Sequence, residues 1–150
     1  MKMGREDRAA AERMGPGATT GPGFLGHDSR ALSDIIEADE EAARAIGLDF
    51  GEAAALLERL AEAAWAGMGE EIEVEGKWIV RSDEARGKLP CPWRDGLYHK
   101  GVARARLVDS DEELAFSELS AHLLREHHFC QGEGSPFRLD PAALKRVLRL

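Results

Sequence analysis

The sequence predicts an α+β domain: an N-terminal helical hairpin, a small antiparallel sheet of three to four strands, and two C-terminal helices packed on that sheet. Three observations predict this class. Apolar residues recur at helical spacing over 32–68, they alternate with polar residues over 71–116, and helix-start signals follow at Ser117 and Asp140. A chain of 150 residues suits one such domain and buries roughly two-thirds of its unfolded surface.

Residues 1–23 are predicted to be a flexible tail in front of a single domain over 24–150. The run at 15–23, GPGATTGPG, favours neither helix nor strand, and a short helix over 5–13 would have no apolar face to dock. The N-terminus lacks the apolar core of a signal peptide, and no stretch approaches the roughly 20 apolar residues of a membrane span. We therefore expect a soluble cytoplasmic protein with free thiols, and the excess of Arg over Lys indicates a GC-rich bacterial genome.

Two helices joined by a short link make up the expected acidic helical hairpin of residues 24–69. Ser33 is the predicted N-cap of the first helix, and Gly47 follows its last residue. Asp49 is the predicted N-cap of the second helix. The apolar positions of this second helix follow the i, i+3, i+4, i+7 rule of a helix with one buried face. They are Ala53, Leu56, Leu57, Leu60, Ala61, Ala64, Trp65 and Met68.

The sheet and the last two helices follow from local signals in the second half, which spans residues 70–150. Four strands are expected, over residues 71–74, 77–81, 99–108 and 113–116. Glu75-Gly76 is a two-residue turn signal that should join the first two strands as a hairpin. The segment 87–96 is predicted to be a loop, because prolines flank Cys91 on both sides.

One face of the 99–108 strand is made of small residues, so a helix can approach it closely. Either the helix over 54–68 or the helix over 117–128 is expected to do so. The small face consists of Gly101, Ala103, Ala105 and Leu107. The last helix begins at Asp140 as N-cap with Pro141 at the first helical position.

Cysteine and histidine residues of the second half indicate a possible zinc site. Zinc is held tetrahedrally by thiolate and imidazole ligands, and the candidates are Cys91, His122, His127 and Cys130, with His99 as an alternative fourth ligand. His127 and Cys130 have a separation common among structural zinc ligands. His122 and His127 lie about 140° apart around a helix, which departs from the spacing of the metalloprotease helix. The alternative interpretation is buried thiols and helix-end histidines that interact with the C-terminal helix dipole.

A glycine-containing loop over 132–138 is a second candidate site, for a small anion or a phosphate group. Glycines let backbone N–H groups turn toward an anion, and hydroxyl and guanidinium groups add donors. The candidate residues are Gly132, Gly134, Ser135 and Arg138. Against this, the loop follows a helix, lacks the Gly-Lys-Ser/Thr ending of a P-loop, and contains Glu133. The alternative is a helix C-cap followed by a turn.

The charge of the chain argues against nucleic acid as a partner. The net charge is −8, the isoelectric point is near 5.2, and in the segment 31–75 Arg44 and Arg59 are the only bases. Binding to a nucleic-acid backbone needs clustered positive charge. The basic stripe on the 99–108 strand is interpreted as a solvated face or as a partner of the acidic hairpin; it consists of Lys100, Arg104 and Arg106.

These patterns favour a non-enzymatic binding or interaction module, which associates with a protein partner or with itself through the acidic hairpin or the tail. The two alternatives are a zinc-binding domain and a protein that binds a small anion or phosphate ligand. No catalytic residue is predicted, because no serine has the G-x-S-x-G context and no nucleophile–base pair is visible. A membrane partner is not expected, and zinc is the only cofactor that the residues suggest.

Overall fold

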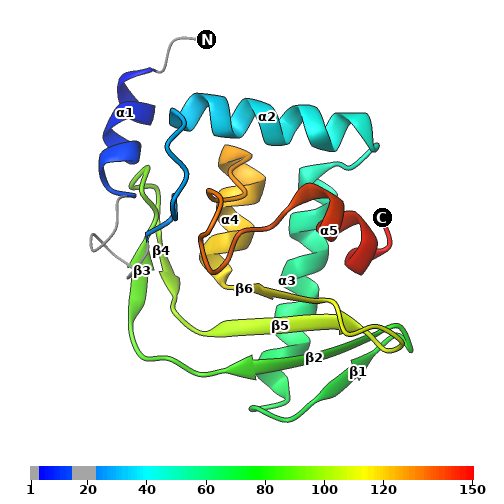
Figure 1. Ribbon diagram of the computed structural model, residues 1–150. Helices are drawn as coiled ribbons and strands as arrows, with labels where there is room; N and C mark the ends of the chain where they lie inside the picture. The colour runs from blue at the N-terminus through cyan, green and yellow to red at the C-terminus, as the bar shows by residue number, and fades with distance from the viewer. Residues whose placement is uncertain (1–3, 15–22) are drawn as a thin grey trace.

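A four-stranded antiparallel sheet in the order β1-β2-β5-β6 forms one layer of the protein, and helices form the other (Figure 1). The computed structural model describes residues 4–14 and 23–150. The sheet strands are β1 (Ile72–Val74), β2 (Trp78–Asp83), β5 (Val102–Leu107) and β6 (Glu113–Phe116). The helices are α1 (Arg5–Glu12), α2 (Leu32–Ala45), α3 (Phe50–Ala66), α4 (Glu118–His127) and α5 (Pro141–Leu148). None of these described helices combines the length and apolarity that crossing a membrane requires.

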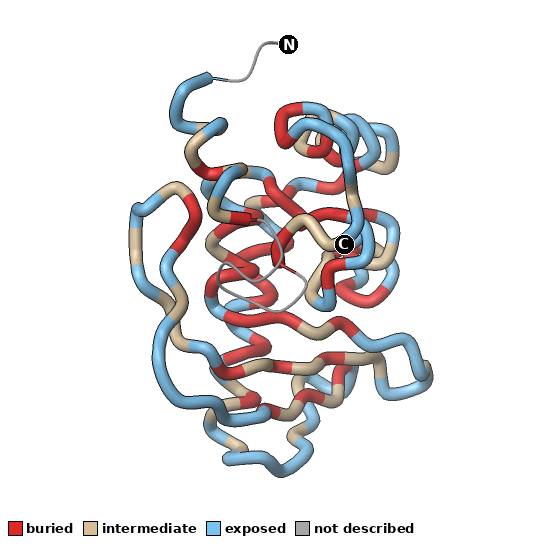
Figure 2. The backbone as a smooth tube through the Cα atoms, turned by 60° about the vertical axis from the view of Figure 1, so that its left-hand side comes forward, coloured by how far each residue is buried: buried red, intermediate tan, exposed pale blue. Residues whose placement is uncertain are grey.

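The helices α3, α4 and α5 lie on one side of the sheet. α3 packs on β1, β2 and β5, α5 packs on β5 and β6, and α4 packs on α3 and β6. Figure 2 shows the buried stretches of chain gathered between these helices and the sheet. The sheet residues buried there alternate along the strands, and they are Trp78, Val80, Ala103, Ala105, Leu114 and Phe116. The predicted α+β class, with the C-terminal helices on an antiparallel sheet, is therefore confirmed.

Small side chains on β5 allow α3 to lie close to the sheet. Ala103 and Ala105 expose 1% and 0% of their surfaces. A Cβ atom added to Gly101 would lie 2.8 Å from Cη2 of Trp65 on α3, which is closer than two carbon atoms can approach. Of the two helices that the sequence offered for this contact, the one over 54–68 covers the small face.

The helices α2 and α3, which correspond to the predicted helical hairpin, diverge after their short link (Figure 1). They therefore do not pack side by side as a hairpin would. α2 packs on α1 and α5, whereas α3 packs on α4 and the sheet. The start of α2 and the apolar face of α3 are buried in different clusters, whereas Ala43 near the end of α2 lies in the same cluster as α3. Leu32 and Ile35 of α2 join one cluster, and Leu57 and Leu60 of α3 join the other. The direction of each helix is therefore set mainly by the other elements against which it packs, and not by the helix next to it in the chain.

The segment over 5–13 forms the helix α1 and docks on the domain, although its sequence showed no apolar face. Ala10 and Met14 are fully buried, in the cluster that also contains Phe24 and Leu119. Two apolar side chains are enough here, because the partner surface is already apolar. The other parts of the predicted tail, 1–3 and 15–22, lie outside the described residues.

Local turn and capping signals match the structure closely, with one exception. Glu75 and Gly76 have φ angles of 54° and 66°, as the two-residue turn between β1 and β2 requires. The side chains of Ser117 and Asp140 accept hydrogen bonds from the first turns of α4 and α5. The exception is Ser33, which is buried inside the first turn of α2 and is not its N-cap.

The segment predicted to be a loop over 87–96 contains part of a small hairpin. β3 (Lys88–Pro90) pairs antiparallel with β4 (Leu97–His99) as a separate two-stranded sheet. The tight loop of residues 91–96 joins them at one end. This hairpin contacts α4 through β4 and carries Cys91 to the side of that helix. It is the element that positions the candidate site.

The α3–β5 contact predicts that Ala103→Leu destabilises the protein by about 1–3 kcal/mol, because three extra carbon atoms overpack a site with no free space. The matched control is Val102→Leu, whose side chain is half-buried on the opposite face of the same strand. Thermal or urea unfolding measures both variants. Equal stability of the Ala103 variant and the unchanged protein would contradict the packing of α3 on β5.

Candidate metal centre

Four side chains with metal-ligating atoms converge between the β3–β4 loop and α4. Cys91 and Asp95 come from the loop, and His122 and His127 come from α4; their ligand atoms all lie within 4.8 Å of one another. Sγ of Cys91 lies 3.7 Å from Nε2 of His127. Oδ1 of Asp95 lies 2.9 Å from Nε2 of His122, and its Oδ2 lies 2.8 Å from Nε2 of His127.

The conformation of the loop brings Asp95 next to Cys91. The backbone N–H of Arg94 donates to the carbonyl of Cys91 at 2.7 Å, which closes a tight turn with Pro92 at its second position. Arg94 adopts a left-handed backbone conformation with φ of 59°. The N–H of Cys91 then donates to the carbonyl of Gly96 at 3.0 Å. The chain therefore reverses within six residues, and side chains at positions i and i+4 face the same point.

His122 and His127 reach the site from two sides although they are five positions apart. On a helix this spacing separates two side chains by about 140° and 7.5 Å. Their rings stand nearly perpendicular, at 74°, with centroids 5.4 Å apart. The Asp95 carboxylate lies beside the helix and takes one histidine on each oxygen. Histidines five residues apart can therefore both reach a group that lies to the side of the helix, as Asp95 does. Histidines four residues apart would instead meet a group directly above one face of the helix.

The charge at the centre is concentrated on Asp95. Partial burial raises the pKa of this carboxyl, but hydrogen bonds from Cys91, His122 and His127 outweigh it and hold the pKa well below its ordinary value. Burial, together with the neighbouring Asp95, raises the pKa of the Cys91 thiol to about 12. Backbone N–H groups of Trp93 and Asp95 act on the sulfur in the opposite direction. A bound dication would favour the thiolate much more strongly than these two N–H groups do.

Aromatic side chains fix the orientation of both imidazole rings. The hydroxyl of Tyr98 lies 2.9 Å from Nδ1 of His122, and the Tyr98 ring stacks on the same imidazole at 4.5 Å. Trp93 stacks on His127 with centroids 4.0 Å apart and planes 6° apart. A hydroxyl can donate to or accept from Nδ1, so Tyr98 leaves Nε2 of His122 free to bind a metal. The indole N–H of Trp93 donates to Asp7 of α1 at 3.0 Å, which ties the N-terminal helix to the loop.

The distances fit a tetrahedral zinc ion. Zinc lies about 2.0–2.3 Å from its ligand atoms, so the corners of its tetrahedron are about 3.3–3.8 Å apart. The pair formed by Cys91 and His127 already has this spacing at 3.7 Å. The two pairs formed by Asp95 are shorter, at 2.8 and 2.9 Å, because they are hydrogen-bonded. A bound metal would move Asp95 about half an ångström away from each histidine, and it would draw together any ligand atoms that now lie as far as 4.8 Å apart by about 1 Å.

A proton relay from cysteine through histidine to aspartate does not fit the same geometry. A relay uses two different nitrogens of one imidazole, one facing the nucleophile and the other facing the carboxylate. Here Nε2 of His127 faces both Cys91 and Asp95. Cys91 also exposes only 1% of its surface. Metal ligands are arranged differently from a relay: each side chain directs one atom toward a common position, as the four side chains do here.

The structure brings together three of the four residues that the sequence offered as zinc ligands. Cys130 does not join them; it is fully buried in the cluster around Leu139 and Leu144, where burial raises its pKa. Asp95 completes the group. Sequence reasoning missed Asp95, although one signal was present: a carboxylate four residues after Cys91, in a proline-containing turn that ends in glycine.

The remaining candidate histidine and the basic strand have other partners. Nδ1 of His99 accepts from the backbone of Gly101 at 3.0 Å, and its ring packs on Trp65. Arg104 pairs with acidic residues of the neighbouring strands β2 and β6, and Arg106 pairs with an acid that precedes β1. The two arginines of the basic stripe are therefore paired with acids of the sheet strands and of the segment before β1, and not with the acidic helices.

The donors of the glycine-containing loop are bound to acceptors of the protein itself. Arg138 forms two hydrogen bonds to Asp39, at 2.9 and 3.0 Å, and a third to a backbone carbonyl. The hydroxyl of Ser135 donates to Gln131, and the N–H of Gly132 donates to a carbonyl of the 23–28 segment. The ring of His27 packs where a side chain at Gly134 would be. These glycines allow two loops to interlock, and the anion site stays a prediction.

No family model matches this sequence, and no curated protein or solved structure matches it. The geometry and the chemistry of the site therefore carry the functional argument.

The contact between Tyr98 and His122 predicts that Tyr98→Phe lowers zinc affinity about tenfold, because the variant loses the hydrogen bond that orients the imidazole. The aromatic ring that stacks on His122 is retained in this variant. Competition with a chromophoric chelator measures the affinity. Circular dichroism and thermal unfolding with excess zinc serve as the control for folding. An unchanged affinity would show that Tyr98 does not support the metal.

Proposed function

We propose that the protein is a non-enzymatic zinc-binding domain whose metal is held by Cys91, Asp95, His122 and His127. The observation that carries the proposal is the convergence of these four ligand atoms within 4.8 Å of one another. They come from two segments separated in the chain, a loop and a helix, so their meeting is a property of the folded protein. Each side chain offers a single atom, as a tetrahedral centre requires.

The donor set favours zinc over the other common cations. Calcium and magnesium take shells of oxygen atoms, of which this site offers only the carboxylate of Asp95. A thiolate with two imidazoles is a borderline-soft set that suits zinc and its close chemical relatives.

A structural role follows from the place of the site in the fold. The β3–β4 hairpin has only two strands and rests on α4 and on α1, whereas isolated two-stranded hairpins are marginal in water. Zinc bound by residues from both elements would crosslink the hairpin to the helix. Four protein ligands fill the tetrahedron and leave no position for a substrate. Metal binding would then contribute directly to the free energy of folding.

A second candidate, a catalytic zinc with one open position, is favoured by a hollow beside the site. The hollow has a volume of about 380 Å³, and its lining includes Asp95, His127, Arg13 and Trp93. Of the two proposed ligands that line this hollow, Asp95 is the more exposed: its side chain is 40% exposed and that of His127 is 17% exposed. If Asp95 left the metal, water could enter from the hollow. Cobalt substitution separates the two roles, because added azide changes the visible spectrum only when a coordination position is open.

We expect about one zinc per chain in untagged protein purified without chelator, as measured by mass spectrometry. Cys91→Ala should remove it, because the thiolate is the strongest donor of the set. Cys130→Ala is the matched control: it also deletes a buried thiol, yet it leaves the four ligands intact. Absence of metal from the unchanged protein, or equal loss in both variants, would contradict the proposal.

Zinc should stabilise the folded state by about 4 kcal/mol when its free concentration is about 1,000-fold above Kd. Urea unfolding in zinc-buffered solution and in chelator measures this difference. It should vanish in Cys91→Ala and persist in Cys130→Ala. A difference of the same size in the Cys91 variant would place the stabilising metal elsewhere.

A further inference from the structure

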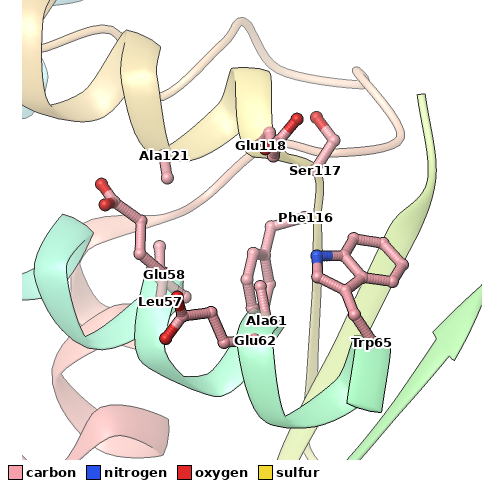
Figure 3. A pocket seen from close by; sticks show the side chains of 9 residues that line it. All are labelled: Leu57, Glu58, Ala61, Glu62, Trp65, Phe116, Ser117, Glu118 and Ala121. Carbon is pink, nitrogen blue, oxygen red and sulfur yellow. The ribbon is translucent and has the colours of Figure 1, made fainter. Parts of the chain in front are cut away.

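A cavity of about 170 Å³ lies between α3, the end of β6 and the start of α4, outside the candidate metal centre. Its floor and walls are apolar, formed by Leu57, Ala61, Phe116 and Ala121 with Trp65 at one end (Figure 3). An engineered protein cavity of about 150 Å³ holds benzene. This cavity therefore has room for one aromatic ring or a short alkyl chain.

Three carboxylates stand around the opening of this cavity. Glu58 and Glu62 project from α3, and Glu118 projects from the first turn of α4, on different sides of the Phe116 ring (Figure 3). Glu58 pairs with Arg125 at 2.5 Å, and Glu118 accepts from the backbone of His99 at 2.7 Å. Within the described part of the chain, Glu62 has neither an ion pair nor a hydrogen bond. The rim thus carries more negative charge than its one cation neutralises.

The opening continues into a second hollow with the same charge. That hollow has a volume of about 270 Å³ and shares Glu58 and Glu118 with the cavity. Its further lining consists of Glu126, Arg125, Tyr98 and His122, so it adjoins the candidate metal centre, and its three acidic side chains outnumber its one arginine. An anionic ligand would meet repulsion along the whole opening, and a neutral one would leave the carboxylate of Glu62 without a partner.

We propose that this cavity binds a primary ammonium group carried on a short apolar body, such as an aralkyl amine or a lysine side chain. The apolar body fills the space over Phe116 and Ala61, and the ammonium lies among the carboxylates of Glu58, Glu62 and Glu118. The Trp65 indole at the wall adds an aromatic face that attracts a cation. The proposal combines hydrophobic shape with charge complementarity. It does not depend on zinc.

Isothermal titration calorimetry of the full-length protein with 2-phenylethylammonium tests the proposal, and 2-phenylethanol is the neutral comparator. We expect binding of the ammonium and at least tenfold weaker binding of the alcohol. Two-dimensional NMR should show shifts at the Trp65 indole and at the amides of Ala61 and Ala121. Equal affinity for the two probes, or shifts elsewhere, would overturn the proposal.

Variants on α3 locate the charge contact. Glu62→Gln should weaken binding of 2-phenylethylammonium about fivefold, because it removes the carboxylate without a protein partner. Glu52→Gln is the matched control, since it makes the same change on an exposed face of the same helix outside the cavity. Ala61→Leu fills the cavity and should abolish binding, and thermal unfolding confirms that the variant is folded. Unchanged affinity in both Glu62→Gln and Ala61→Leu would overturn the assignment.

N-acetyl-lysine methylamide distinguishes the two sources of the ammonium group. Binding of this probe at the same NMR signals assigns the cavity to a lysine side chain of a protein partner. Binding of 2-phenylethylammonium alone assigns it to a free amine. Failure of both probes would refute the cavity as an ammonium site, and it would leave the zinc measurements unaffected because those depend on other residues.

Discussion

The close contact between α3 and the small-residue face of β5 is the constraint on which the rest of the structure depends. Because Gly101, Ala103 and Ala105 have little or no side chain, α3 lies close to the sheet. α4 packs on α3 in turn, and it carries both histidines of the candidate metal centre. The position of the site thus follows from side-chain volumes on a strand that contributes no ligand.

The candidate metal centre joins one firmly held element to one weakly held element. α4 is anchored in the core through residues such as Leu123 and Leu124, which are fully buried. The β3–β4 hairpin and its loop contribute one fully buried side chain, Cys91, to the neighbouring hydrophobic cluster. The hairpin is also held by α4, by the Trp93 contact with Asp7 and by the hydrogen bond from Arg13 to Pro92. A metal crosslink acts most strongly at such a place, because it replaces contacts that a short hairpin cannot make.

Both proposed sites contain carboxylates, Asp95 in one and Glu62 in the other, and these carboxylates are the reason why cations are proposed for both. The arginines of the sheet strands are paired with nearby acids: Arg81 and Arg104 with Asp83, and Arg106 with Glu71. The acidic excess of α3 and α4 stays on the helical side. Asp95 and Glu62 are two carboxylates on that side, in a chain with a net charge of −8. A dication and an ammonium group match this field, whereas an anion does not.

Local patterns in the sequence predicted most of the helix caps and turns and named three of the four side chains that converge at the candidate metal centre. The caps at Ser117 and Asp140 and the two-residue turn could be predicted because each depends on residues within four positions. Three of the four converging side chains could be named for a different reason: thiols and imidazoles are recognised as candidate metal ligands from residue type alone. No local pattern indicated that Asp95 joins the other three side chains, that Cys130 belongs to the core, or that Met14 packs into a buried cluster. These outcomes depend on which distant segments pack together, and the volumes and partners of buried side chains set that packing beyond the reach of any local pattern.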